Sequence, residues 1–349
     1  MGNQITLIHY NNSQLDINKL EVFSPEERSR IENIVLQFPK GDGLPGHYIR
    51  ASFDYSVLCF NAIKDRIKEF DFIYTKGFSG WKLIKEKQIH PDWPPIGVKF
   101  HGYEMFQKQA DFKSLLKSLL LKRPVKWVSL HADFVFSYGS KITEIIKGLG
   151  VETKRIVEIP AGIEPDWVRH ELPSVAPVKT FTFLGRYERR KGVEELNASI
   201  DALLAKGLKF KFNFIGPFEE FQKIKNDAVI YHGSITDNNK IRALLDDTDF
   251  LVCPSWSEGM PNVILEAMSR ACAIIATDVG ATSIMVSENN GYLIQAGQVD
   301  MLTKALENAL KISDAQLLVF KLKSLEKIET QFVYDILKDK LHNSIKKLL

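Results

Sequence analysis

The chain has 349 residues, of which 45% are hydrophobic and 26% are charged, and its formal net charge is +3 at pH 7. This length predicts two domains, and the small net charge without an arginine-rich tract argues against a nucleic-acid-binding protein. The widely spaced Cys59, Cys253 and Cys272 argue against a disulfide framework or a zinc site, and the absence of a run of about 20 apolar residues or a signal-peptide pattern favours a cytoplasmic protein.

The first half of the chain alternates short apolar runs with longer amphipathic stretches. The runs of strand length cover residues 5–10, 33–39, 70–76, 95–102, 133–139 and 155–160. The stretches between them, such as residues 49–67, carry apolar side chains at helical spacing. Because the strands are almost continuously apolar, both faces of their sheet should be covered, which predicts a parallel sheet with crossover helices.

A glycine-rich loop separates the second of these strands from the helix that follows it. Gly41, Gly43 and Gly46 form a G-x-G-x-x-G pattern, which in a dinucleotide-binding protein holds a pyrophosphate. Glycines at this spacing are also common in simple turns. An NAD enzyme would in addition need an acidic residue at the end of the next strand, but Asp71 lies at the start of its strand. The pattern therefore does not indicate a dehydrogenase.

The second half repeats the alternation after a proline-containing linker at residues 171–180. Its expected strands cover residues 180–187, 211–217, 229–235, 249–256, 273–277 and 291–294. We therefore expect two α/β domains, residues 1–172 and 173–328, followed by a C-terminal helix over 329–349. Ligands of such sheets bind at the carboxyl ends of the strands, so the ligand should lie in a cleft between the two domains.

Two glutamates flank the start of a predicted helix in the second half. Glu258 and Gly259 directly follow a strand, Pro261 indicates that a helix begins, and Glu266 lies about five residues into it. The free backbone amides of residues 260–263 favour an anionic group. Carboxylates accept hydrogen bonds from hydroxyl groups, so the order carboxylate, amides, carboxylate fits the sugar, diphosphate and ribose of a nucleotide sugar. Taken alone, the two glutamates could equally be a loop charge and a solvated helix residue.

A basic segment after the first strand of this half supports the ligand-binding interpretation. Gly185 ends the strand, and Arg186 and Lys191 follow it in a G-R-x4-K-G pattern. Two cations at this place suit a departing diphosphate, whose developing charge must be neutralised. Arg189 and Arg190, which lie between them, are expected to be solvated.

These two segments resemble the retaining GT-B glycosyltransferases of family 4, also called group 1, whose E-x7-E motif matches Glu258 and Glu266. The resemblance covers most of residues 155–295 and implies two Rossmann-like, doubly wound domains that face one another across a cleft. It departs from the family at Ala271 and Cys272, where a glycine and a proline are usual, which leaves the end of the helix open.

The resemblance also implies roles for individual residues. Arg186 and Lys191 would stabilise the departing diphosphate, Glu258 would orient the sugar, and no nucleophile is assigned. His101 follows a strand in an H-G-x-[DE] pattern and is expected to face the donor sugar or the acceptor. The expected substrate-binding residues are Gly41, Gly43, Gly46, Glu104, Gly185, Gly216, Ser234, Ile235, Gly259, Met260, Pro261, Asn262, Val263 and Glu266.

Two further segments allow more than one interpretation. Residues 246–249 contain a D-x-D pattern, but they lie where a helix passes into a strand, so we expect helix termination and no essential metal. Residues 111–127 mix leucines with lysines and arginine. This stretch could dock on the inner face of an anionic membrane, as a peripheral protein does, or it could be an ordinary packed helix with a solvated face.

The predicted function is a retaining, metal-independent transfer of a hexose-type sugar from a UDP- or GDP-sugar to a glycan or lipid-linked acceptor, in cell-surface polysaccharide or glycolipid synthesis. No cofactor and no nucleic-acid partner are expected. Two alternatives remain: a nucleotide-sugar epimerase of the same fold, and a catalytically silent relative that only binds.

Overall fold

The computed structural model describes residues 2–10, 23–171 and 174–349. The described chain forms two compact units, and each is taken by itself below. The first unit comprises residues up to Phe100, residues 120–135 and the last two residues, and the second comprises residues 101–119 and 136–347. The expected boundary at residues 172 and 173 lies outside the described residues.

The first unit contains short parallel strand pairs and the helices that follow them. Its elements are β1 (Ile5–Tyr10), α1 (Pro25–Ser29), β2 (Ile31–Leu36), α2 (His47–Ile63), β3 (Ile73–Lys76), α3 (Trp81–Lys87) and β4 (Ile96–Lys99). β1 pairs with β2 and β3 pairs with β4, both in parallel. Along the chain, α4 (Phe112–His131) leads from the second unit into the first, and β5 (Phe134–Ser137) leads back.

The glycine-rich loop has the predicted place between β2 and α2. Gly43 and Gly46 have φ values of 75° and 82°, which a residue with a side chain rarely adopts. Asp42 holds the loop together, since its carboxylate pairs with Arg50 at 2.7 Å and accepts a hydrogen bond from the Leu44 amide at 3.0 Å. The strand, glycine loop and helix expected from the sequence are therefore present.

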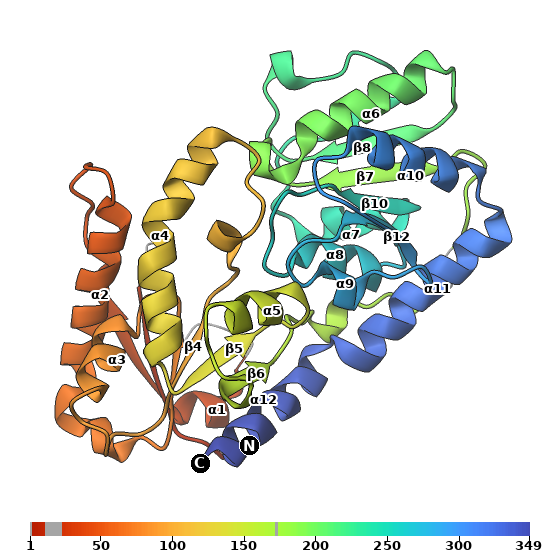
Figure 1. Ribbon diagram of the computed structural model, residues 1–349. Helices are drawn as coiled ribbons and strands as arrows, with labels where there is room; N and C mark the ends of the chain where they lie inside the picture. Colours follow the sequence, from red (N-terminus) through yellow and green to blue (C-terminus); the bar gives the residue numbers. More distant parts are fainter. Residues whose placement is uncertain (1, 11–22, 172–173) are drawn as a thin grey trace. The chain divides into compact units, whose positions relative to one another are not determined.

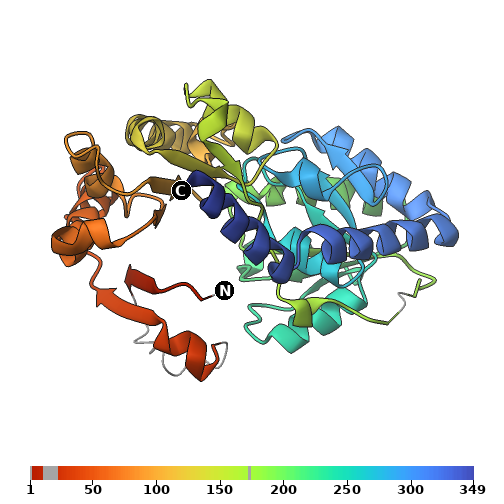
Figure 2. The same cartoon turned by 90° about the horizontal axis from the view of Figure 1, so that it is seen from below.

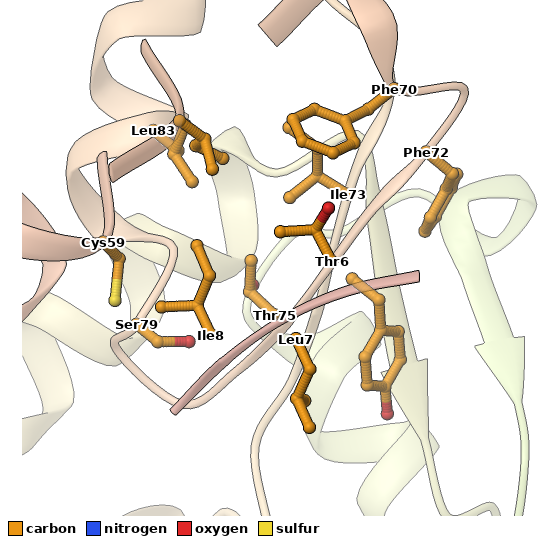
Figure 3. A pocket seen from close by; sticks show the side chains of 12 residues that line it. Thr6, Leu7, Ile8, Cys59, Phe70, Phe72, Ile73, Thr75, Ser79 and Leu83 are labelled. Carbon is orange, nitrogen blue, oxygen red and sulfur yellow. The ribbon is translucent and has the colours of Figure 1, made fainter. Parts of the chain in front are cut away.

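A cavity of about 150 Å³ lies within the first unit, lined by side chains of β1, α2, β3 and α3 (Figure 3). Its lining includes Ile8, Cys59 and Ile73 and contains no charged residue. Burial raises the pKa of the Cys59 thiol to about 11, so this sulfur is a neutral thiol at neutral pH. A lining without a cation is unsuited to a phosphate or other anion.

The second unit contains the remaining elements. They are α5 (Lys141–Gly148), β6 (Ile156–Glu158), β7 (Thr180–Leu184), α6 (Val193–Ala205), β8 (Lys211–Ile215), β9 (Val229–Tyr231), α7 (Asn238–Asp246), β10 (Phe250–Cys253), α8 (Asn262–Ser269), β11 (Ala273–Thr277), α9 (Thr282–Met285), β12 (Gly291–Ile294), α10 (Val299–Lys311), α11 (Asp314–Gln331) and α12 (Tyr334–Leu348). Each strand predicted in either half of the sequence is present, with ends that differ by up to four residues.

Six of these strands form one parallel sheet in the order β12-β11-β10-β7-β8-β9. The chain begins in the middle at β7, builds outward to β9, and then returns to β10 beside β7. This is the doubly wound arrangement, and its switch point lies between β7 and β10, where loops diverge and ligands bind. In Figure 1, α6 and α10 lie on one side of this sheet and α7, α8 and α9 on the other.

The core on one face of this sheet is largely aromatic. Phe181, Phe212 and Phe250 come from three neighbouring strands, and each is at most 1% exposed. The Phe181 ring stacks on the other two rings with centroid separations of 6.0 and 5.8 Å. Because the rings interlock across strands, they hold β8, β7 and β10 in register and fix the loops that leave their carboxyl ends.

The end of α8 shows how the chain accommodates its departure from the family pattern. The helix ends at Ser269, close to the predicted position, and Ala271 then adopts a left-handed φ of 61°. This conformation is the one that favours glycine. The predicted helix termination at residues 246–249 is also confirmed, because α7 ends at Asp246, whose carboxylate binds Arg270 at 2.6 Å.

The two last helices of the second unit, α11 and α12, meet at a bend, which Figure 2 shows between the two blue helices at the end of the chain. At this bend the Ile163 amide donates to the Phe332 carbonyl at 2.8 Å, and the Tyr334 amide donates to the Ile163 carbonyl at 3.0 Å. The neighbouring Gly162 leaves room for the Leu337 side chain, which a Cβ atom there would touch. None of the helices in the described part of the chain is long and apolar enough to cross a bilayer.

A buried ion pair ties α11 to the strand β10. Lys321 and Asp249 are 3% and 2% exposed, and their charged atoms are 2.8 Å apart. The second carboxylate oxygen of Asp249 accepts from the Thr180 amide at 3.0 Å, and the Lys321 ammonium also donates to the Ser174 carbonyl at 3.0 Å. Both charges are thus compensated, which is what allows them to be buried.

We predict that Lys321→Met lowers the free energy of unfolding, measured with urea, by about 3–5 kcal/mol, because it leaves the Asp249 carboxylate buried without its cation. Lys323→Met on the same helix is the matched control, since Lys323 forms an exposed pair with Glu326. Its effect should stay within about 0.5 kcal/mol. Equal effects of the two substitutions would contradict the assigned role of the buried pair.

Candidate functional site

The candidate site lies at the switch point of the six-stranded sheet, where the loops after β7 and β10 meet. The chain turns at Arg189–Lys191 after β7, and α6 then begins with Gly192 at φ 71°. A Cβ atom on Gly192 would collide with the Pro254 carbonyl oxygen, so only glycine lets these loops touch. The Trp256 amide also donates to the Arg190 carbonyl at 2.8 Å, which fixes the register of the two loops.

At the centre of this meeting point is the buried carboxylate of Glu258, which is 7% exposed. One oxygen accepts hydrogen bonds from the Lys191 ammonium at 2.7 Å and from the Ser255 hydroxyl at 2.8 Å. The other oxygen lies 3.4 Å from the Arg190 guanidinium, which also donates to the Ser257 carbonyl at 2.8 Å. The site therefore combines one anion with two cations in fixed positions.

The side chain of Gln107 forms hydrogen bonds with both backbone polar groups of Glu258. The Gln107 amide nitrogen donates to the Glu258 carbonyl at 2.6 Å, and its oxygen accepts from the Glu258 amide at 3.3 Å. Nearby, a Cβ atom on Gly259 would collide with the His101 carbonyl oxygen. The loop after β4 and the loop after β10 are thus in backbone contact, and Gln107 supplies the hydrogen bonds that a strand neighbour would otherwise make.

The Trp256 ring, two residues before Glu258 in the chain, contacts two further cations. The Arg189 guanidinium and the Lys108 ammonium lie 5.0 and 4.8 Å from its ring centre, within the range of cation–π attraction. Arg189 also forms two hydrogen bonds with the Glu195 carboxylate, at 2.7 and 2.8 Å. This pairing contributes to a lowered pKa of Glu195, which keeps the carboxylate charged.

The helix α8 presents the second glutamate and an open helix start. Its N-cap residue is Pro261, whose side chain cannot accept a hydrogen bond, so the first backbone amides are not capped by this residue and keep their donor capacity. Glu266 lies five residues into α8, partly buried, and burial raises the pKa of its carboxyl group above the ordinary 4.5. None of the hydrogen bonds or ion pairs found among the described residues involves this carboxylate, which can therefore accept from a ligand.

The loops after β7, β8 and β9 also lie together. The Gly185 amide donates to the Ile215 carbonyl at 2.9 Å, and the Gly216 amide donates to the Gly233 carbonyl at 2.8 Å. Gly216 has a φ of 147°, and a Cβ atom there would collide with the Gly185 carbonyl oxygen. Ser234 and Ile235 directly follow Gly233 in the loop after β9, and Ser234 is exposed.

The structure brings some of the predicted site residues together and separates others. Lys191 and Glu258 are in contact, as described above, and Gly259, Met260, Pro261, Asn262 and Val263 follow them into α8. Arg186 is 73% exposed and pairs with Glu188 at 2.8 Å, so it does not contact Glu258. The loop with Gly41, Gly43 and Gly46 belongs to the first unit, and its role stays a prediction.

Two of the first-half residues expected at the site, His101 and Glu104, belong to the second unit with Glu258. His101 has an exposed side chain, and its Nδ1 lies 3.5 Å from the Tyr138 hydroxyl. Glu104 begins a short helical turn and approaches Gly102 so closely that a Cβ atom there would meet its carboxylate. Burial, and secondarily the charge of Glu104, raise the pKa of Tyr138, so this phenol is a neutral hydrogen-bonding group.

Sequence reasoning was wrong about two arginines and missed two polar residues. Arg189 and Arg190 were expected to be solvated, but they bind Glu195 and Glu258. The sequence predicts no role for Gln107 or Ser255. The only signal for them is that each lies close in the chain to a selected residue, Gln107 after His101 and Ser255 before Glu258.

Comparison with solved structures shows that the chain has the GT-B fold. It superposes on sucrose-phosphate synthase from Thermosynechococcus elongatus with a TM-score of 0.72 and 19% identity, covering 99% of this chain and 89% of that one. The lipopolysaccharide outer core galactosyltransferase WaaB gives a TM-score of 0.69 with 18% identity, covering 91% and 85%. At these identities the likeness concerns the fold alone, two Rossmann-like domains.

The sequence comparisons point to a family. Residues 178–311 match the family model described as "Glycosyl transferases group 1", a segment that holds Arg186, Lys191, Glu258 and Glu266. TuaC of Bacillus subtilis, provisionally named a teichuronic acid biosynthesis glycosyltransferase, is 32% identical over 50% of this chain and 46% of its own. The capsular polysaccharide biosynthesis glycosyltransferase CapM of Staphylococcus aureus is 25% identical over 37% and 36%. The matched stretches span less than half of these relatives.

We predict that Gln107→Ala loosens the loop after β10 because the Glu258 amide and carbonyl lose their side-chain partner. In hydrogen–deuterium exchange, the amides of residues 257–260 should exchange at least about 10-fold faster. Gln109→Ala is the matched control, since Gln109 donates only within its own segment, to the Glu104 and Gln107 carbonyls. Unchanged exchange in Gln107→Ala would show that this glutamine does not position Glu258.

Proposed function

We propose that the protein is a retaining glycosyltransferase that moves a hexose-type sugar from a nucleotide-diphosphate sugar to a glycan or lipid-linked acceptor in cell-surface polysaccharide synthesis. The observation that carries this proposal is the buried Glu258 carboxylate between Lys191 and Arg190, at the switch point of a parallel sheet and directly before an uncapped helix start. This site combines a carboxylate that can accept hydrogen bonds from hydroxyl groups with cations and backbone amide donors. The sugar, the diphosphate and the ribose of a nucleotide sugar require these groups.

The cations act on the leaving group. When the bond between the anomeric carbon and the diphosphate oxygen breaks, negative charge develops on the diphosphate. The Lys191 ammonium is already held in place by Glu258, so it need not be reoriented as the charge grows. Arg186 lies on the surface, five residues before Lys191 in the chain, and its exposed pair with Glu188 is weak enough to be exchanged for phosphate oxygens. On this proposal, protein cations neutralise the diphosphate and no metal ion is required.

The two glutamates bind hydroxyl groups at the two ends of the donor. Glu258 accepts from the sugar with lone pairs that its protein donors leave free, and Glu266 accepts from the ribose diol. The α8 amides of Asn262 and Val263 hold the diphosphate between them. His101 and Glu104, on the loop in contact with Gly259, face the transferred sugar or the acceptor.

Known proteins support the substrate classes in this proposal. A solved structure of HepE from Anabaena, in complex with UDP-glucose, shares the fold with a TM-score of 0.64 at 15% identity, covering 92% of this chain and 87% of that one. A Campylobacter jejuni relative, 29% identical over 42% of this chain and 40% of its own, is named a diphospho-undecaprenol N-acetylgalactosaminyltransferase. We therefore propose a UDP- or GDP-sugar donor and a lipid-linked or glycan acceptor.

The experiment that tests this function begins with a panel of nucleotide sugars, each screened for a rise in melting temperature. The donor that stabilises the protein is then incubated with and without acceptors, in the presence of EDTA, and the anomeric configuration of the product is read by NMR. Transfer with retention supports the proposal. A nucleotide sugar altered at one carbon, without any acceptor, would instead identify an epimerase, and binding without turnover would identify a silent relative.

We predict that Lys191→Ala lowers kcat by about 10²–10³-fold, since it removes a fixed cation from the departing diphosphate. Lys206→Ala is the matched control, because Lys206 also pairs with a glutamate, Glu307, but on the surface after α6. It should retain full activity. A kcat for Lys191→Ala within about twofold of the unmodified protein, with an unchanged melting temperature, would contradict the proposed role.

We predict that donor binding weakens as the pH falls toward the raised pKa of Glu266. The protonated carboxyl group accepts fewer hydrogen bonds from a diol than the carboxylate does, and burial makes it protonate at a higher pH than an exposed glutamate. The donor KM should therefore rise as the pH is lowered from neutral, and this rise should begin at a higher pH than the protonation of an exposed glutamate would cause. Glu266→Gln should remove this rise, whereas Glu329→Gln, an exposed glutamate on α11, should keep it. The same pH profile in all three proteins would contradict the assignment.

A further inference from the structure

The first turns of α4 carry an apolar stripe that faces away from the protein. Phe112, Leu115, Leu116, Leu119 and Leu120 follow the spacing i, i+3, i+4, i+7, i+8, which places them on one face of the helix. All five are exposed, Phe112 to 78% and Leu116 to 58%. A surface helix normally turns such a stripe toward its core, so the exposure of residues 112–120 does not fit the alternative of an ordinary packed helix.

The opposite face of the same turns is polar and covered. Ser118 is only 4% exposed, and its hydroxyl donates to the Leu115 carbonyl at 2.6 Å. At 100° per residue, Ser118 and the buried Val125 lie on nearly the same side of the helix, and the leucine stripe lies on the other. The helix thus exposes its leucines and buries a serine, an arrangement that leaves apolar area in contact with water.

The lysine and arginine side chains of the helix itself are not balanced by any acidic residue within it. The helix carries Lys113, Lys117, Lys122, Arg123 and Lys126, and the sequence has no Asp or Glu between Asp111 and Asp133. Lys113 and Lys122 flank the stripe on its two sides, and Arg123 and Lys126 extend it toward the C-terminal end. Their long aliphatic stems allow the ammonium and guanidinium groups to lie at a different depth from the leucines.

We propose that residues 112–126 of α4 form a docking surface for an anionic lipid bilayer, on which the helix lies flat. The aromatic and leucine side chains would enter the boundary between headgroups and acyl chains, and the flanking cations would bind lipid phosphates. The charge pattern favours lipid over a protein partner, because a bilayer presents a continuous negative surface above an apolar layer, which matches both features of the stripe. This inference goes beyond the proposed function and does not depend on it, since none of the side chains of the stripe is assigned to donor binding.

The test uses the full chain and vesicles of phosphatidylcholine with or without about 30% phosphatidylglycerol. In cosedimentation, the protein should bind the anionic vesicles, and binding should weaken as salt is raised. Leu116→Ser/Leu119→Ser and Lys113→Glu/Arg123→Glu should each weaken binding at least about 10-fold. All four side chains are exposed, so the melting temperature of the variants should not change.

Matched controls carry the same substitutions elsewhere on the surface. Phe221→Ser replaces an apolar side chain that is 87% exposed, and Lys154→Glu reverses a lysine that is 80% exposed. Both controls should bind anionic vesicles like the unmodified protein. The proposal is overturned if the protein ignores anionic vesicles or if the serine variant binds them equally well. It is also overturned if light scattering shows that the stripe instead joins two copies of the chain, with lipid binding unaffected by its loss.

Discussion

The candidate site depends on one buried electrostatic arrangement, the Glu258 carboxylate between Lys191 and Arg190. A carboxylate this deeply buried needs compensating partners, and here two cations and the Ser255 hydroxyl provide them. The same contacts hold the cations in place before any ligand arrives. An anion that enters the site therefore meets charges whose orientation the fold has already fixed, so little reorganisation is needed on binding.

The arrangement follows from the strand order. Since the sheet is doubly wound, the loops after β7 and β10 leave neighbouring strands, and the loops bring Lys191 and Glu258 into contact although they are 67 residues apart in the chain. The aromatic core below keeps these strands in register, and Gly192 permits the close approach of the loops. The site is therefore a consequence of topology and of one glycine, as much as of the charged residues themselves.

The sequence predicts this fold and part of the site because both leave local signals. Strand-length apolar runs locate every strand, and Lys191 and Glu258 stand out because each follows a strand within a patterned segment. The sequence carries no such signal for the partners of Arg189 and Arg190. Where these two side chains point depends on the contact between two loops that are far apart in the chain. Gln107 shows the same limit, because nothing local distinguishes a glutamine that clamps a backbone from one in solvent. For α4, periodicity reveals the apolar stripe but cannot tell which side of the helix is covered.

The protein uses buried charge in two different ways in one domain. Lys321 and Asp249 compensate one another and two backbone groups far from the loops, and this pair belongs to the structure alone. The charges at Glu258 are more accessible to solvent than those of the Lys321–Asp249 pair. The Lys191 side chain is 21% exposed, and the N-cap residue Pro261 of the neighbouring helix provides no capping hydrogen bond. A ligand can accept hydrogen bonds from the Lys191 ammonium and from the first backbone amides of α8. A buried pair stabilises the fold when its partners are saturated, and it becomes a binding site when one side remains accessible.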